Sequence, residues 1–140
     1  MDDIIARCVA IKRDVVEADE FDKGERMLLN FGHTLGHSIE QYYHYTGISH
    51  GRAVAKGMEI ITDLAEKRGM CRKGLTADLC GCLKKYELTR DIGPTPAQLG
   101  SACMNDKKRD GSSIHVIICS DIGKSSAVKM SVADFNDFLA

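Results

Sequence analysis

The chain has 140 residues, of which 44% are hydrophobic and 28% charged, and its formal net charge is −1. These values are ordinary for a globular protein, and the length suits one domain over residues 1–140 with a core of its own. The near-zero charge gives no electrostatic basis for binding nucleic acid or an anionic membrane. No apolar run approaches the roughly 20 residues that cross a bilayer, and the N-terminus lacks a signal-peptide pattern, so we expect a cytoplasmic location.

Helical spacing of apolar residues predicts helices over residues 3–18, 25–45, 51–69 and 72–85. An irregular start near Asn30 is left open for the second helix, and Gly69 is a suitable stop for the third. Pro96 suits the first position of a further helix that runs to about residue 104. The β-branched segments 114–119 and 127–130 predict two strands joined by a turn. Ser131 is a suitable cap for a last helix. The predicted fold class is therefore mainly α, a helical bundle with a small β-hairpin near the C-terminus.

Six cysteines lie at positions 8, 71, 80, 82, 103 and 119. Only Cys80 and Cys82 are close in sequence, and the paired CxxC pattern of a metal or disulfide framework is missing. The spacing favours free thiols, packed in the interior as small apolar residues.

Three histidines form the most informative pattern. His33 and His37 are four residues apart in a segment with helical spacing, so their side chains share one helix face. His50 follows a break at residues 46–47, and a second element can bring it back to that face. Three imidazoles suit zinc or a similar divalent ion. The alternative is that they are ordinary polar residues on a solvated face.

The residues around these histidines favour a site over a solvated face. Phe31, Leu35 and Ile39 are apolar and alternate with the histidines. Gly32 and Gly36 lower helix propensity, and they leave room for a ligand or another backbone to approach closely.

The wider pattern resembles a known family. Residues 29–40 read LNFGHTLGHSIE and residues 50–58 read HGRAVAKGM, and together they resemble the C-terminal, metal- and substrate-binding domain of 3-dehydroquinate synthase. The likeness extends to Lys12, Arg26, residues 105–108 and residues 122–123. It covers nearly the whole chain and is more specific than any single motif. The N-terminal domain, which carries most of the NAD site in that family, has no counterpart in these 140 residues.

The resemblance implies a metal site for zinc or cobalt. His33 and His50 correspond to two of the family's ligands. The third ligand in the family is a glutamate upstream of the helix that carries Lys12, and this sequence does not contain it. His37 corresponds to a histidine that contacts the substrate and helps to move protons, a role that suits an imidazole.

The resemblance also implies an anion site. Lys12, Arg26 and Asn30 correspond to catalytic and substrate-binding residues, and Lys107 and Lys108 to residues that hold phosphate. A phosphate dianion and a carboxylate need several cations or amide donors. Composition alone instead favours Lys12 as a surface lysine with a packed aliphatic stem. It leaves the loop at Lys107 and Lys108 evenly balanced between an anion site and a solvated charged segment.

The implied reaction belongs to the shikimate pathway. In it, a seven-carbon keto-acid sugar phosphate loses phosphate and cyclises, with NAD as a transient oxidant and a metal as Lewis acid. We expect the isolated chain to be inactive and to need an N-terminal NAD-binding domain as partner, with a homodimer left open. A related sugar-phosphate cyclase, such as a 2-deoxy-scyllo-inosose synthase, is the alternative enzyme. A non-catalytic binding domain on the same scaffold is the alternative outside enzymes.

Two positions depart from the family pattern. Arg52 stands where the family usually has glutamate, and Lys56 stands where it usually has an apolar residue. A positive charge at residue 52 weakens cation binding if its head group faces the metal.

Overall fold

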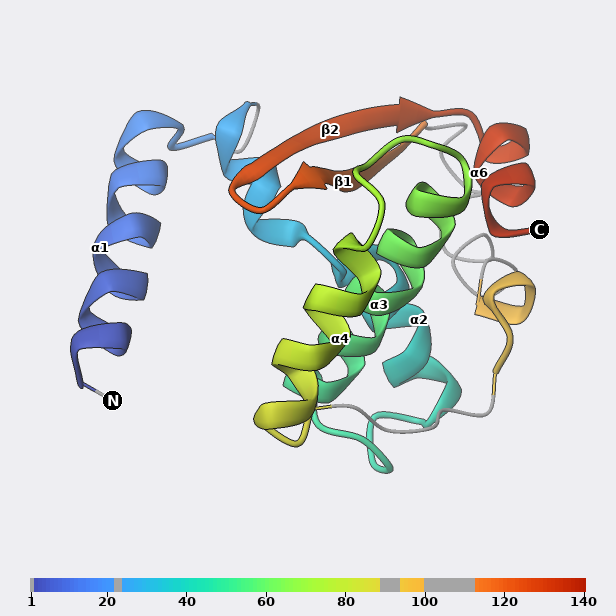
Figure 1. Ribbon diagram of the computed structural model, residues 1–140, viewed down its shortest axis with the longest axis horizontal. Helices are drawn as coiled ribbons and strands as arrows, with labels where there is room; N and C mark the ends of the chain where they lie inside the picture. The colour runs from blue at the N-terminus through green and yellow to red at the C-terminus, as the bar shows by residue number, and fades with distance from the viewer. Residues whose placement is uncertain (1, 22–23, 89–93, 100–112) are drawn as a thin grey trace.

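The structure is a computed structural model that describes residues 2–21, 24–88, 94–99 and 113–140 (Figure 1). In chain order the elements are α1 (Asp2–Ala18), the 3₁₀ helix η1 (Glu25–Asn30), α2 (His33–Tyr42), α3 (His50–Lys67), α4 (Leu75–Lys85), β1 (Ile114–Asp121), β2 (Lys124–Met130) and α6 (Val132–Leu139). The mainly helical class with a C-terminal hairpin is confirmed. Among the described residues, no helix combines the length and apolarity needed to cross a membrane.

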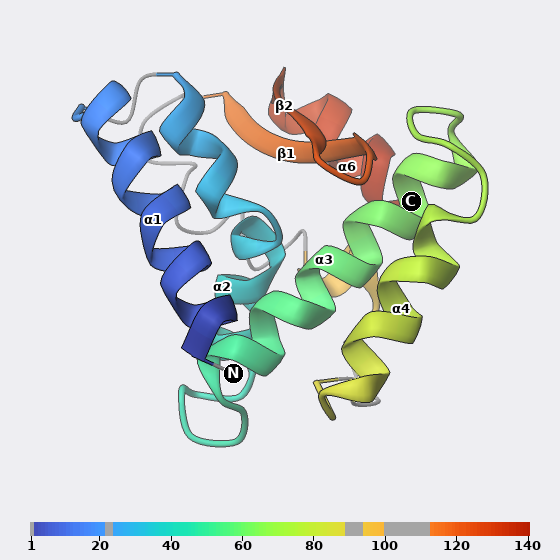
Figure 2. The same ribbon diagram turned by 60° about the vertical axis from the view of Figure 1, so that its left-hand side comes forward.

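The core lies where α2, α3, the hairpin and α6 meet. Its fully buried side chains come from elements far apart in sequence: Leu35, Ile39, Ile61, Leu99, Ile114, Val116 and Phe135. The strands pair antiparallel, with Ile114 opposite Met130 and Val116 opposite Val128. Ser131 begins α6 with a reciprocal capping box to Asp134, as its residue type predicted. The hairpin and α6 therefore close the core over one side of the α2–α3 pair (Figures 1 and 2).

Helices α2 and α3 cross with their backbones in close contact, because glycines lie at the crossing. Gly32 has a φ of +79°, and a Cβ there would lie 2.6 Å from the Val54 carbonyl oxygen. A Cβ on Gly36 would lie 3.1 Å from the Val54 Cα, and one on Gly57 would overlap the Gly32 carbonyl oxygen. The sequence left open whether Gly32 and Gly36 make room for a ligand or for another backbone. The structure shows the second, because the backbone of α3 lies against both glycines.

The predicted helix over residues 25–45 is not continuous. Residues 25–30 form the 3₁₀ helix η1, and the left-handed Gly32 then turns the chain before α2 begins at His33. The turn breaks the helix because only glycine adopts this φ without strain. Arg26 and Asn30 thus lie on a separate element from the two histidines, which the apolar spacing alone did not reveal.

The prediction of buried cysteines is wrong. Cys8 and Cys82 are exposed, and Cys71, Cys80 and Cys119 are only half-buried. These five thiols are free. Desolvation raises the pKa of the Cys71, Cys80 and Cys119 thiols, which keeps them protonated and poorly nucleophilic. Cys103 lies outside the described residues.

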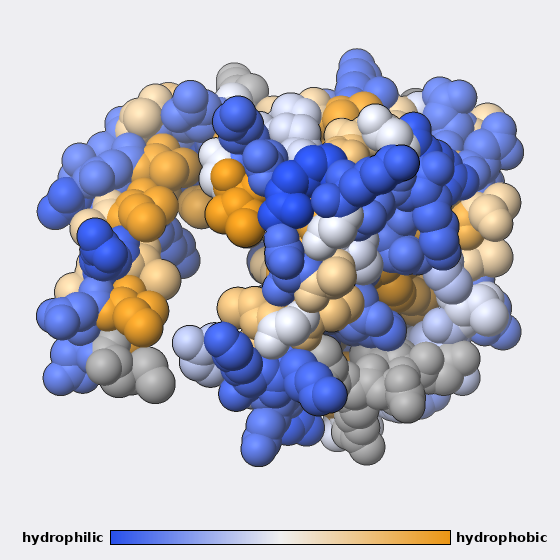
Figure 3. All heavy atoms as spheres, in the orientation of Figure 1, coloured by the Kyte–Doolittle hydropathy of each residue, from blue (hydrophilic) through white to orange (hydrophobic). Residues whose placement is uncertain are grey.

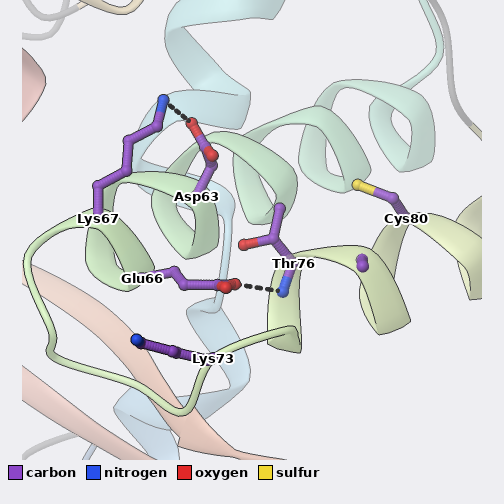
Figure 4. A pocket seen from close by; sticks show the side chains of 7 residues that line it. Asp63, Glu66, Lys67, Lys73, Thr76 and Cys80 are labelled. Atoms are coloured by element: carbon purple, nitrogen blue, oxygen red, sulfur yellow. Dashed lines mark hydrogen bonds and ion pairs between the residues drawn. The ribbon is translucent and has the colours of Figure 1, made fainter.

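Glu66 on α3 caps the start of α4 from the neighbouring helix. The carboxylate of Glu66 accepts hydrogen bonds from the backbone N–H groups of Gly74 at 2.6 Å and Thr76 at 2.9 Å (Figure 4). These bonds satisfy donors that a helix start leaves without partners. They stabilise the ionised carboxylate and lower the pKa of Glu66 from 4.5 to about 2.

This cap predicts a specific acid sensitivity. Because the pKa of Glu66 is lower in the folded state, its contribution to stability is complete above about pH 4.5 and is lost as the pH falls towards about 2. We expect the free energy of unfolding of Glu66→Gln to depend less steeply on pH across this window than that of the wild type. Urea unfolding at a series of pH values measures it. Glu17→Gln, on the exposed surface of α1, is the control and should keep the wild-type slope.

Helix α1 packs chiefly against η1 and stands apart from the body of the molecule along most of its length (Figures 1 and 3). None of its residues is buried. Ile4, Ile5, Val9 and Ile11 are each more than half exposed, and Figure 3 shows apolar side chains gathered along the helix. The helix exists where the sequence predicted it, but its apolar side has no partner among the described residues.

Candidate metal and substrate site

The three histidines of the sequence pattern come together in the structure. His33 and His37 lie one turn apart on α2, and His50 is the first residue of α3. Their ring centroids are 5.6 Å apart for His33 and His37, 5.2 Å for His33 and His50, and 6.2 Å for His37 and His50. The break before His50 therefore returns it to the His33/His37 face, because the glycine crossing holds α2 against α3.

The spacing of His33 and His50 fits two ligands of one metal ion. Two imidazoles bound through nitrogen to a tetrahedral zinc at about 2.1 Å place their ring centroids roughly 5 Å apart. The observed 5.2 Å matches this value. Within the described residues, however, no group of three or more His, Cys, Asp or Glu side chains is arranged as a complete metal site. The described residues therefore offer two imidazoles at ligand spacing, and the metal site stays a prediction.

Both proposed ligands have one ring nitrogen already engaged. The Nδ1 of His33 lies 3.3 Å from the Phe31 carbonyl oxygen, and the Nδ1 of His50 lies 3.0 Å from Glu40 Oε1. Both acceptors lack protons when the carboxylate is ionised, so each Nδ1 carries the hydrogen. Each Nε2 then presents a lone pair. This is the arrangement that metal-binding histidines usually show in proteins.

Glu40 was not singled out from the sequence as a functional residue. A signal was available, because Glu40 follows His33 by seven residues and His37 by three, which places all three on one side of α2. Its partner His50 is ten residues later, across a connection whose path the sequence does not show.

Among the described residues, none of the other predicted site residues forms a hydrogen bond or an ion pair with the three histidines. The Nη1 of Arg26 donates to the Glu20 carbonyl oxygen at 2.7 Å, and Asn30 is exposed at the end of η1. Lys12 is exposed on α1. Lys107 and Lys108 lie outside the described residues. The roles of these residues remain predictions.

The two departures from the family pattern have different surroundings. Lys56 forms an ion pair with Glu59 at 2.8 Å, one turn along α3, so its charge is balanced locally. Arg52 is half-buried in the first turn of α3, two residues after His50. His44 is exposed in the connection after α2 and takes no part in the ring contacts of the three histidines.

A pocket between α3 and α4 is lined by residues that do not include the three histidines, and Figure 4 shows its side chains. Its lining includes Glu66, which caps α4, and Asp63 and Lys67, which pair with each other at 2.7 Å. Glu66 is occupied by backbone N–H groups and Asp63 by Lys67, so we assign these side chains a structural role.

Comparison with known proteins decides the family. Residues 1–109 match the family described as 3-dehydroquinate synthase C-terminal. The chain belongs to this 3-dehydroquinate synthase family. It is 45% identical over 134 residues to the 3-dehydroquinate synthase of Clostridium perfringens, covering 95% of this chain and 38% of that relative. It is 41% identical over 140 residues to that of Enterococcus faecalis, covering 99% of this chain and 39% of that relative. The chain thus spans about two fifths of the length of these synthases.

Solved structures of related cyclases share the fold. A 2-deoxy-scyllo-inosose synthase complexed with carbaglucose-6-phosphate, NAD+ and Co2+ superposes with a TM-score of 0.79 at 23% identity, covering 96% of this chain and 39% of that protein. A 2-epi-5-epi-valiolone synthase from Streptomyces hygroscopicus, with NAD+ and Zn2+ bound, gives a TM-score of 0.76 at 22% identity, covering 97% and 38%. At this identity the likeness shows the shared fold alone.

Proposed function

We propose that this chain is the metal- and substrate-binding part of a 3-dehydroquinate synthase. The observation that carries the proposal is the pairing of His33 and His50, 5.2 Å apart between ring centroids and each with Nδ1 engaged. A divalent metal such as zinc or cobalt, held by their Nε2 atoms, supplies Lewis-acid polarisation of a substrate hydroxyl or carbonyl. The family match, and relatives at 41–45% identity that carry the same name, support this function over that of the related cyclases.

The proposal assigns His37 to proton transfer and binding of the substrate. Its ring lies 5.6 Å from that of His33, beside the proposed metal, and its side chain is exposed. Within the described residues it makes no hydrogen bond, so its nitrogens are available to a ligand. Arg26, Asn30, Lys12, Lys107 and Lys108 are proposed to bind the carboxylate, hydroxyls and phosphate of a seven-carbon sugar-acid phosphate.

The proposal also assigns a partner to α1. The relatives are about two and a half times as long as this chain, and the match is to their C-terminal part. We propose that an upstream NAD-binding domain covers the exposed apolar side of α1. Lys12 lies on this side, four residues after Cys8 and seven after Ile5. A domain packed there would enclose the lysine beside the substrate.

Metal titration tests the proposed site. We expect the 140-residue chain to bind Co2+ or Zn2+ weakly, because the proposed site has two protein ligands among the described residues. Visible absorption of bound Co2+ and calorimetry are the readouts. His33→Ala and His50→Ala should each abolish this binding. His44→Ala is the matched control, since His44 is exposed and outside the cluster, and should bind as the wild type does. Equal metal binding by all four proteins would overturn the proposed site.

Turnover tests the proposed reaction. We expect no phosphate release from the seven-carbon substrate by the chain alone with NAD, and release when an upstream NAD-binding domain from a relative is supplied. The product distinguishes the enzymes, since 3-dehydroquinate identifies this synthase and an inosose identifies the related cyclase. Turnover by the highly purified 140-residue chain would contradict the need for the second domain.

A further inference from the structure

We propose that Glu40 is the positioning residue of the metal site, which orients His50 and fixes its tautomer. The inference rests on the proposed metal-binding function and adds a residue to it. In this arrangement the Nδ1–H of His50 donates to Glu40, and Nε2 is left with its lone pair as a metal donor in a ring 5.2 Å from that of His33.

The geometry gives Glu40 this role. Its side chain is 13% exposed, whereas that of His50 is 58% exposed. The carboxylate therefore lies on the α2 surface as the more constrained partner, and the ring of His50 is the group that needs to be held. His50 begins α3, and its ring lies beside those of His33 and His37. Among the described residues, the 3.0 Å hydrogen bond to Glu40 is the polar contact of this ring, and it directs Nδ1 towards the carboxylate.

The chemistry of the acceptor decides the tautomer. An ionised carboxylate has no proton to donate, so the Nδ1 of His50 has to carry the hydrogen and the Nε2 keeps its lone pair. The negative charge beside Nδ1 also makes Nε2 a stronger donor to a cation. His33 has a neutral acceptor instead, the carbonyl oxygen of Phe31 at 3.3 Å. Of the two ligands, His50 should therefore depend more on its partner's side chain.

The competing interpretation is an ordinary surface ion pair. Exposed pairs of this kind contribute little to stability, and under this interpretation the pair has no effect on a bound metal. The two interpretations differ in what a change at Glu40 does to metal affinity, rather than in what it does to folding.

The experiment measures Co2+ affinity of the 140-residue chain and the tautomer of His50. Glu40→Ala should weaken Co2+ binding about 10- to 100-fold, the loss typical for a partner behind a metal ligand. Glu40→Gln should lose less Co2+ affinity than Glu40→Ala, because its amide oxygen still accepts the hydrogen bond from Nδ1. It should still bind more weakly than the wild type, because the negative charge is gone. Nitrogen NMR of the metal-free protein should show His50 protonated on Nδ1 in the wild type, and a mixture of tautomers in Glu40→Ala. Asp63→Asn, which breaks the ion pair with Lys67, is the control for a lost carboxylate and should change neither readout.

The outcomes separate this inference from the proposed function. If His50→Ala loses Co2+ binding while Glu40→Ala and Glu40→Gln bind as the wild type does, the role of Glu40 is wrong and the metal site stands. If His50→Ala also binds as the wild type does, the metal site itself is wrong and the inference falls with it. Thermal unfolding of each variant shows whether any loss reflects unfolding. The inference is supported if both variants are folded and Glu40→Gln loses less Co2+ affinity than Glu40→Ala.

Discussion

Gly57→Ala should destabilise the protein by about 1–3 kcal/mol or more, although it exchanges a glycine in a helix for the best helix former. A Cβ at this position overlaps the Gly32 carbonyl oxygen and lies 3.0 Å from the Gly36 backbone nitrogen. Both neighbours are backbone atoms and cannot rotate away as a side chain would. Helix α3 therefore has to move away from α2, and urea or thermal unfolding measures the cost.

The same substitution should weaken metal binding. The proposed ligands lie on opposite sides of this crossing, His33 on α2 and His50 on α3. A shift of one helix against the other changes the separation of their rings, now 5.2 Å between centroids. Co2+ titration of the folded variant measures this second effect.

Gly81→Ala is the matched control for the propensity effect. Gly81 lies inside α4, and a Cβ added to it meets no atom within 4 Å. This substitution should stabilise the protein by up to about 1 kcal/mol, because alanine loses less backbone entropy than glycine in a helix. If Gly57→Ala is as stable as Gly81→Ala, the close crossing of α2 and α3 is not what the glycine provides.

The sequence predicted the fold class and most elements, because apolar spacing and caps are local signals. The start of α6 at Ser131 and the end of α3 near Gly69 are examples. Gly69 has a φ of +68°, and the bonds from its N–H to Glu66 and from the N–H of Met70 to Ala65 form the expected helix end. An irregular start near Asn30 was left open, but the turn at Gly32 itself was not predicted, since a glycine between apolar residues is also compatible with a continuous helix.

The candidate site was predictable to the extent that it lies on one helix face. His33 and His37 followed from their spacing, whereas the hydrogen bond between Glu40 and His50 depends on how α3 packs on α2. The burial expected of the cysteines failed for a similar reason. Residue type predicts which side chains are often buried, but Cys8 belongs to a helix whose apolar side is left open.

Ile5→Asp and Val9→Asp should each weaken association of this chain with an upstream NAD-binding domain at least about tenfold. Both side chains lie on the apolar side of α1, 55% and 63% exposed in the structure. Full burial of such a side chain is worth about 1.5–3 kcal/mol, and a buried unpaired carboxylate adds a desolvation cost. Each 1.4 kcal/mol corresponds to tenfold in affinity. Calorimetric titration of the chain with a separately produced domain from a relative measures the change.

Ala6→Asp is the matched control, because it adds the same charge to α1 on the side that also carries Arg13, seven residues later. We expect it to bind the domain as the wild type does, and circular dichroism should show the same helix content in all three variants. Equal weakening by Ala6→Asp would mean that charge alone, and not the apolar side, controls association.

Sedimentation of the chain alone tests whether a second copy of the chain, instead of the NAD-binding domain, covers the apolar side of α1. If Ile5→Asp converts a dimer to a monomer and leaves domain binding unchanged, a second copy of the chain covers this side of α1, because an apolar surface of this kind is buried by whichever partner packs on it.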